Sequence, residues 1–182
     1  TGVQTCALPI SITPRELKTA MQISRMLDFY YNSTAWQHII RELICENEDF
    51  LKDFTSHLDT IMVLDSPLSL ERRGVILYEY CKEHQPSRLT DISVAWINAG
   101  CSLKKKPAEK TVKAKHIDFD FENGSVCIMD RHLDMADKTF KMVIQYGTPD
   151  PYHKYFILPY SEGFFLFGYD SHAVQFAIIH MH

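Results

Sequence analysis

The thirteen residues HIDFDFENGSVCI, at positions 116–128, decide which kind of fold the second half of the chain adopts. Apolar and polar side chains alternate from His116 to Phe121, which is typical of a strand with one buried face. Asn123-Gly124 is the strongest short signal for a hairpin turn. The stretch therefore predicts an antiparallel hairpin. The register we expect pairs Glu122 with Ser125, Phe121 with Val126 and Phe119 with Ile128.

Further strand-like segments follow the hairpin, and turn-forming Gly, Pro, Ser and Asp residues separate them. We expect these segments to extend the hairpin into a mostly antiparallel sheet. They span residues 140–146, 155–160, 163–169 and 173–180.

Upstream of the hairpin the apolar residues recur at helical spacing. Thr13, Pro14 and Glu16 form a capping-box start, and the first helix is expected to run to about Tyr31. Four more amphipathic helices are predicted before Gly100, which is placed to end the last one. The predicted class is therefore α+β, with a five-helix bundle-like half followed by an antiparallel β-sheet half.

Residues 1–10, TGVQTCALPI, back-translate without a gap to ACT GGA GTT CAG ACG TGT GCT CTT CCG ATC. This resembles the constant oligonucleotide that is ligated to DNA fragments before sequencing. We therefore expect residues 1–10 to be an adapter-derived scar and exclude them from fold reasoning. The domain interpretation is a helical region at 11–100, a Lys-rich linker at 101–115 and a β-rich region at 116–182. We expect residues 11–182 to form one accessory domain together.

Composition excludes several classes of protein. With 46% hydrophobic and 23% charged residues, the chain has the balance of an ordinary globular protein. A net charge of −4 gives no general attraction to nucleic acid, and the six lysines of the linker lack interleaved aromatic residues that could stack on bases. The longest apolar run is too short to cross a bilayer. Four cysteines outside residues 1–10, none in a CxxC pair, indicate reduced thiols and a cytoplasmic protein.

One group of polar residues could carry chemistry on the first hairpin. His116, Asp118 and Asp120 alternate along one strand, and Arg131 could lie across from them. An imidazole and two carboxylates can bind a divalent metal or transfer protons. Alternation also places polar residues on any half-exposed strand, so we interpret the group as a solvent-facing surface. The closing His180-Met181-His182 could bind a soft metal, although chain ends usually fray.

A nucleophilic cysteine would need a histidine near its thiol. Cys101 is the candidate, with His153 or His172 as its partner. The sequence contains no GxxxxGK[ST], GxGxxG, HExxH or GxSxG motif. We therefore assign no catalytic, cofactor-binding or metal-binding residue, and an accessory or binding domain is the favoured class.

Three stretches of the helical half resemble segments of one protein family. They are LDFYYNS at 27–33, SPLSL at 66–70 with LYEY at 77–80, and AWINAG at 95–100 with SLKKKP at 102–107. In this order and spacing they are similar to the C-terminal domain of unknown function in bacterial radical SAM proteins that carry an N-terminal cobalamin-binding domain. The likeness covers about Ile12 to Pro107.

The resemblance implies that catalysis belongs to a part of the parent protein upstream of this chain. Such enzymes hold a 4Fe–4S cluster with a CxxxCxxC triad, bind S-adenosylmethionine at that cluster and bind cobalamin in a separate domain. No such triad is present here. The expected partners are the radical SAM barrel and the cobalamin-binding domain, both in cis. Two alternatives stay open. The first is a self-contained protein- or ligand-binding module, and the second is a small metal-dependent or Cys/His enzyme. The binding surface of the first would be an aromatic patch at Phe164, Phe165, Phe167, Tyr169 and Phe176.

Overall fold

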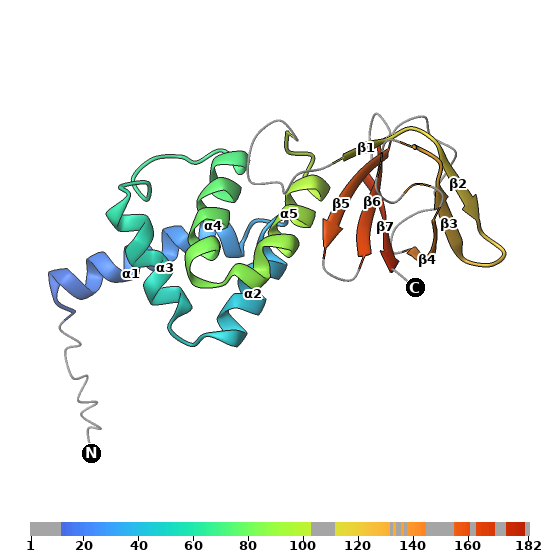
Figure 1. Ribbon diagram of the computed structural model, residues 1–182. Coiled ribbons are helices and arrows are strands. Elements are labelled where there is room, and N and C mark those ends of the chain that lie inside the picture. The colour runs from blue at the N-terminus through green and yellow to red at the C-terminus, as the bar shows by residue number, and fades with distance from the viewer. Residues whose placement is uncertain are drawn as a thin grey trace, which may run out of the picture. The chain divides into compact units, whose positions relative to one another are not determined.

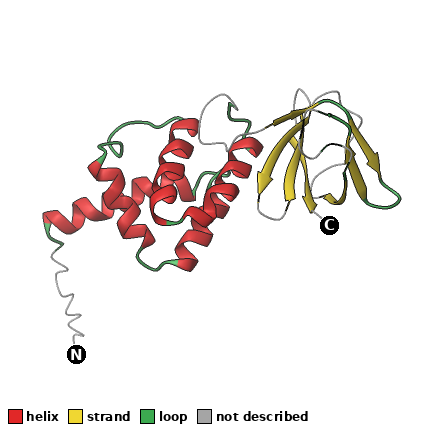
Figure 2. Cartoon of the chain, in the orientation of Figure 1, coloured by secondary structure: helices red, strands yellow, loops and turns green. Residues whose placement is uncertain are grey.

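Helices occupy the first part of the chain and strands the second (Figure 2). The computed structural model describes residues 12–102, 112–131, 133, 136, 138–144, 155–160, 163–169 and 174–180. The described strands pair only in antiparallel fashion, so the predicted α+β class is confirmed. Contacts between Cα atoms divide the chain into two compact units, Thr1–Ser69 and Leu70–His182.

Three α-helices build the first unit: α1 (Pro14–Met26), α2 (Gln37–Glu46) and α3 (Phe50–Thr60). The predicted first helix does reach Tyr31, but its last part, Leu27–Tyr31, is a π-helix. This π-turn places Tyr30 in the core, where its ring meets Phe54 edge-on at 5.0 Å and Phe54 stacks on Phe50 at 5.3 Å. Aromatic packing therefore fixes how α3 lies against the end of the first helix.

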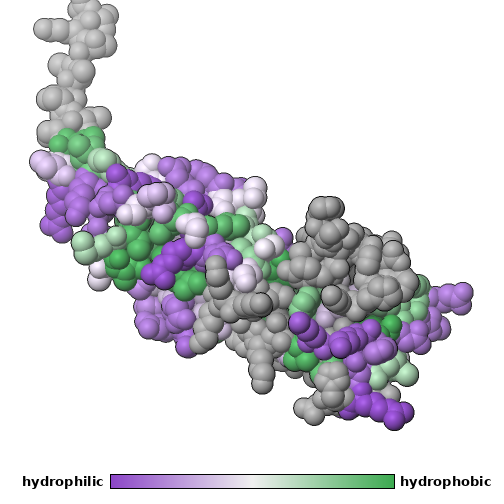
Figure 3. Space-filling view, turned by 90° about the horizontal axis from the view of Figure 1, so that it is seen from above, coloured by the Kyte–Doolittle hydropathy of each residue, from purple (hydrophilic) through white to green (hydrophobic). Residues whose placement is uncertain are grey.

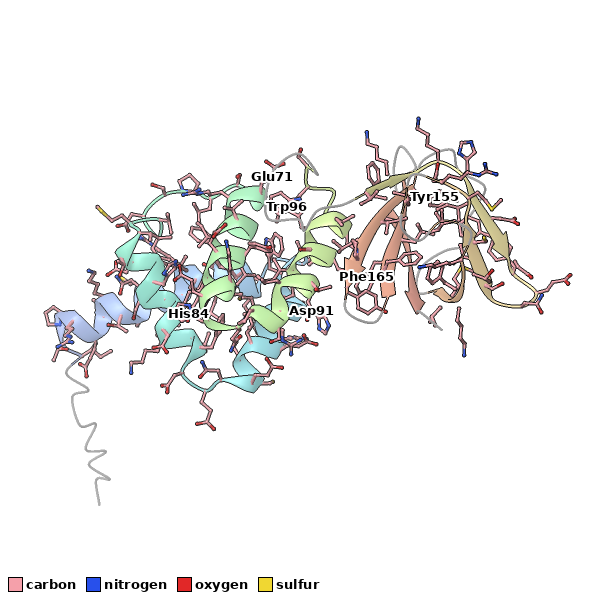
Figure 4. All side chains as sticks on the ribbon, in the orientation of Figure 1. Glu71, His84, Asp91, Trp96, Tyr155 and Phe165 are labelled. Atoms are coloured by element: carbon pink, nitrogen blue, oxygen red, sulfur yellow. The ribbon has the colours of Figure 1, made fainter. Side chains whose placement is uncertain are left out.

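The second unit begins with α4 (Leu70–His84) and α5 (Leu89–Asn98), which pack together and are joined by a 3-10 turn at Pro86–Arg88. Gly100 ends α5 with a positive φ of 70°, as expected for a residue just past a helix. Trp96, which is fully buried, donates from Nε1 to the carbonyl of Ser102 at 3.2 Å. The Ser102 amide in turn donates to Glu71 Oε1 at 3.2 Å, so the chain leaving α5 is bonded back to α4 (Figure 4).

Seven strands form one sheet in the order β1-β5-β6-β7-β4-β3-β2. β1 (Val112–Ala114) falls in the segment predicted as linker, and most of that segment lies outside the described residues. The other strands agree with the predicted segments to within a few residues: β2 (Ile117–Asp120), β3 (Ser125–Ile128), β4 (Thr139–Ile144), β5 (Tyr155–Tyr160), β6 (Gly163–Tyr169) and β7 (Val174–His180).

The sheet is curled, so that strands from its two ends share one core (Figure 1). Phe119 belongs to the end strand β2, yet its ring lies 5.4 Å from Tyr155 of β5, near the other end of the strand order. Phe140 of β4 and Phe164 of β6 meet edge-on at 5.0 Å inside the same cluster. This core holds β2 and β3 in place and determines which of their side chains face outward.

The predicted hairpin register is wrong by two residues. Phe119 lies opposite Val126, Ile117 opposite Ile128 and Asp120 opposite Ser125. The turn contains four residues because the Asp120 carboxylate accepts hydrogen bonds from the backbone and side-chain nitrogens of Asn123, at 3.0 and 2.6 Å. A two-residue slip keeps every side chain on its predicted face, so the core face is as expected.

Among the described residues, no helix combines the length and apolar character that crossing a bilayer requires.

Candidate functional site

The outer face of the β2–β3 hairpin carries polar and sulfur-containing side chains that could do chemistry. Val126 and Ile128 are buried in the core, so the alternating residues of β3 point the other way. The outward residues are His116, Asp118 and Asp120 on one side of the hairpin and Ser125, Cys127 and Met129 on the other.

Asp130 is a buried carboxylate at the base of this hairpin, with a relative exposure of 6%. Its Oδ2 accepts hydrogen bonds from the backbone amides of Lys115 at 2.6 Å and His116 at 3.0 Å. Both amides lie between β1 and β2, where the chain turns from one strand into the next. The carboxylate therefore satisfies two backbone donors at a corner of the sheet.

The pKa of Asp130 lies below that of an ordinary aspartate, as the net result of effects that raise it and effects that lower it. Burial alone raises the pKa, because it penalises the charged form. The two backbone hydrogen bonds, the hydrogen bond from the His116 ring and the attraction of that imidazole all lower it and together outweigh burial. The carboxylate is therefore ionised at neutral pH and remains a strong acceptor.

His116 is oriented by this carboxylate while its ring stays in solvent. Its Nδ1 lies 3.3 Å from Asp130 Oδ1, and its side chain is 74% exposed. A carboxylate at Nδ1 favours the tautomer with the proton on that nitrogen. The Nε2 atom, on the opposite edge of the ring, is then the nitrogen with a free lone pair.

Two sulfur-containing residues, Cys127 and Met129, share the outward face of the hairpin with His116. The Cys127 thiol donates to Met129 Sδ across 3.7 Å. The Met129 amide donates to the His116 carbonyl at 2.9 Å, so these two residues lie opposite each other and continue the ladder of β2 and β3. Opposite residues in such a pair have Cβ atoms about 5 Å apart. The hairpin thus brings a thiol and a thioether into contact and places His116 directly opposite Met129.

The acidic part of the predicted group does not form a metal site. Asp118, Asp120 and Arg131 are exposed, and Asp120 is engaged in the turn. Its hydrogen bonds from the Asn123 side chain and backbone lower its pKa. Among the residues that the structure describes, no three His, Cys, Asp or Glu side chains converge as metal ligands. The side chains of His180, Met181 and His182 lie outside the described residues.

The other predicted candidates are buried or lie outside the described residues. Cys101 is buried at the end of α5, where its amide donates to the Trp96 carbonyl at 3.2 Å, and His153 and His172 lie outside the described residues. Phe164 and Phe167 are buried and Phe165 is half-buried, so these three rings form no exposed aromatic patch.

A second surface of interest lies on α1, in the first unit. Thr13 and Glu16 form the predicted capping box, with Glu16 N 3.2 Å from Thr13 Oγ1 and Thr13 N 2.8 Å from Glu16 Oε2. Ile12, Leu17 and Met21 are each more than half exposed, and we call these three residues the α1 patch. In Figure 3, green (apolar) atoms are uncovered where α1 begins. An amphipathic helix of a globular domain normally buries such residues, so the patch is a candidate contact surface.

The turn after α3 adds a further exposed apolar residue next to this helix. Lys18 of α1 pairs with Asp59 at 3.7 Å, and Arg25 bonds the Leu64 carbonyl at 3.2 Å and the Asp65 carboxylate, so α1 lies along the end of α3. Met62 occupies this turn with a φ of 56° and a relative exposure of 83%.

Glycine usually fills the position that Met62 occupies. The amides of Met62 and Val63 donate to the carbonyls of Asp59 at 3.0 Å and Leu58 at 3.2 Å, which is the Schellman arrangement. A side chain in this left-handed conformation costs about 1 kcal/mol. Met62 therefore carries a small conformational cost while its side chain is exposed to solvent.

Sequence reasoning missed the contributions of Asp130, Cys127, Met129 and Met62. A signal for Cys127 and Met129 was present in the sequence. These two residues alternate with Val126 and Ile128, so the face opposite to the core includes both of them. Nothing in the sequence indicated that Asp130 would bond back to residues 115 and 116. No protein-family model, curated protein or solved structure matches this chain in the comparisons with known proteins.

Proposed function

We propose that this chain is the non-catalytic C-terminal accessory domain of a cobalamin-binding radical SAM enzyme. In this proposal the domain packs on the catalytic barrel through the α1 patch. The observation that carries the proposal is the uncovered apolar surface of Leu17 and Met21 on the well-capped helix α1, together with Ile12 just before its cap. Exposure of apolar side chains to water is unfavourable in free energy, and a docking partner that covers them removes this unfavourable contribution.

The three stretches that resemble the family support the proposal because they coincide with structure-determining residues. The first contains the π-turn with buried Tyr30, and Asn32 Nδ2 donates there to Asp28 Oδ1 at 2.9 Å. The second leads into α4, and the third ends α5 at Gly100. A likeness at caps and core positions is typical of a shared fold rather than of a shared active site.

The size of the patch favours a partner in the same chain. Its three side chains are roughly half exposed, so covering them contributes about 1 kcal/mol each, or about 3 kcal/mol in all. Micromolar binding between separate molecules needs about 8 kcal/mol. A domain attached directly upstream has an effective concentration in the millimolar range, so about 4 kcal/mol is enough to hold it in place, and the patch supplies most of this amount.

The cofactors of the parent enzyme are assigned to its upstream part. The sequence lacks the CxxxCxxC triad that holds a 4Fe–4S cluster, and S-adenosylmethionine binds at that cluster. Burial raises the pKa of Cys81 to about 12, which makes its thiol a poor ligand at neutral pH. We assign no step of the reaction to this chain, and cobalamin belongs to its own domain in the same proposal.

The first test is the nucleotide sequence upstream of the Ser11 codon in the source genome. An in-frame region that encodes CxxxCxxC, preceded by a cobalamin-binding region, supports the proposal. A start codon close upstream, with neither region, overturns it.

The second test uses the parent protein and probes the docking surface. Leu17→Asp in the α1 patch should release the domain and expose the junction to limited proteolysis. Ser24→Asp, at an exposed polar position of the same helix, is the matched control and should leave the cleavage rate unchanged. Equal cleavage rates in the two variants would contradict docking through this patch.

A further inference from the structure

We propose that Cys127, Met129 and His116 form a surface site for a monovalent copper ion, Cu(I). The site lies on the outer face of the β2–β3 hairpin, and it does not depend on the docking role of α1. Its ligands would be the Cys127 thiolate, the Met129 thioether and the His116 Nε2 atom.

The distance between the two sulfur atoms already suits one bound ion. Three-coordinate Cu(I) with metal–sulfur bonds of about 2.3 Å and angles near 120° requires the sulfurs to lie about 4 Å apart. The Cys127 and Met129 sulfurs lie 3.7 Å apart without a metal. The two sulfur ligands therefore need only a small adjustment to hold one ion, because both side chains are flexible and Met129 is half exposed.

His116 has the orientation that metal-binding histidines usually have. Such a histidine donates its second ring N–H to a carboxylate or carbonyl, which fixes the ring and its tautomer. The buried Asp130 carboxylate lies 3.3 Å from His116 Nδ1 and is itself fixed by two backbone amides. Nε2 is left as the available donor, on a residue that lies directly opposite Met129.

The choice of metal follows from the softness of the donors. Thiolate and thioether sulfur select Cu(I), whereas Zn(II) and harder ions prefer sets of nitrogen, oxygen and thiolate ligands. Such a harder set would need Asp118 to join His116 and Cys127, and these three side chains do not converge among the described residues. The thioether of Met129 is what distinguishes the present site.

Binding is a simple exchange of a proton for a metal ion. The Cys127 thiol, which donates to Met129 in the absence of metal, releases its proton to solvent, and the thiolate forms a bond to Cu(I). Met129 and His116 contribute lone pairs without a change of protonation. No electron is transferred, and the bound unit of one Cu(I) and one thiolate carries no net charge.

The test is an anaerobic titration of the full chain with Cu(I) in competition with a chromogenic Cu(I) chelator. Exposed Cys45 could bind copper by itself, and Cys6 lies outside the described residues, so both are first replaced by serine. This background protein should bind one equivalent of Cu(I), and Cys127→Ser should abolish the binding.

Two further variants separate a three-ligand site from a single thiol. Loss of a residue that only hydrogen-bonds to a metal ligand weakens metal binding about 10- to 100-fold. Met129→Leu and His116→Gln each remove a ligand itself, so each should weaken Cu(I) affinity at least about tenfold. X-ray absorption should show two sulfur neighbours and one nitrogen neighbour. Affinities within twofold of the background protein for both variants would overturn the proposal, as would a single sulfur neighbour. Circular dichroism of each variant checks that the fold is retained.

Discussion

The Asp130 carboxylate offers the sharpest test of how the corner between β1 and β2 is held. Its Oδ2 accepts both backbone hydrogen bonds, from Lys115 and His116, whereas Oδ1 accepts only from the His116 ring. Asp130→Asn can keep one carbonyl oxygen in the Oδ2 position and preserve both backbone bonds. Asp130→Ala removes all three. The pair of variants therefore separates backbone capping from contact with the imidazole.

The magnitudes follow from the type of hydrogen bond. A hydrogen bond to a charged group contributes about 1.5 to 3 kcal/mol, and a buried donor left without a partner costs about 1 to 3 kcal/mol. We expect Asp130→Ala to destabilise the hairpin by about 3 to 5 kcal/mol, because two backbone amides lose their acceptor. Asp130→Asn should cost about 1 kcal/mol, since the backbone bonds survive in weaker, uncharged form.

The assay must report on the sheet itself. Both tryptophans, Trp36 and Trp96, lie in the helical part of the chain, so their fluorescence does not follow the hairpin. Hydrogen exchange measured by mass spectrometry on peptides covering β2 and β3 does follow it. Equal exchange rates in Asp130→Ala and Asp130→Asn would refute the reasoning, because they would show that Oδ2 does not cap the corner.

The same residue predicts a pH dependence whose sign can be derived. The pKa of Asp130 in the folded chain lies below the value of an unfolded aspartate, which is about 3.9. Its stabilisation is therefore fully present above about pH 4 and is lost as the pH falls through the folded pKa. Asparagine does not titrate in this range, so hydrogen exchange of the hairpin should depend less on pH below about pH 4 in Asp130→Asn than in the unchanged chain. The same pH dependence in both proteins would contradict the lowered pKa of Asp130.

Three further predictions concern other parts of the chain. Met62→Gly should stabilise the first unit by about 0.5 to 1 kcal/mol in urea denaturation, because glycine adopts the left-handed conformation without strain, and a loss of stability would contradict this. Thr13→Ala should destabilise α1 by about 1 kcal/mol, because it removes the N-terminal cap. This should appear as faster hydrogen exchange in the first turn of α1. Unchanged exchange in that turn would argue against the capping box. At pH 8 iodoacetamide should alkylate exposed Cys45 and leave Cys81 unmodified. The reason is that a pKa of about 12 leaves only about one Cys81 thiol in ten thousand ionised at this pH. Equal labelling of the two residues would show that Cys81 is not buried.

Much of the fold could be predicted because local signals and burial agree. The capping box at Thr13 and the spacing of apolar residues predicted the first helix, and alternation over 116–121 predicted the inner face of β2. The hairpin register could not be obtained from Asn123-Gly124 alone, because the Asp120 carboxylate bonds Asn123 and selects a longer turn. The π-turn at 27–31 depends on the rings of α3, which are distant in sequence.

The candidate sites were only partly predictable for a similar reason. His116 was identified from its place on an alternating strand, but its importance depends on Asp130, fourteen residues later in the chain. The sulfur pair depends on side-chain conformations that no sequence pattern specifies. The α1 patch reads in the sequence as an ordinary core-facing stripe, and only the structure shows that its residues are uncovered.

The most direct test of the docking role is hydrogen exchange on α1, measured both in this chain alone and in the parent protein that contains the catalytic barrel. If the barrel covers the α1 patch, amides around Leu17 and Met21 should exchange at least about tenfold more slowly in the parent protein, which corresponds to about 1.4 kcal/mol. Equal exchange rates in the two proteins would contradict the account.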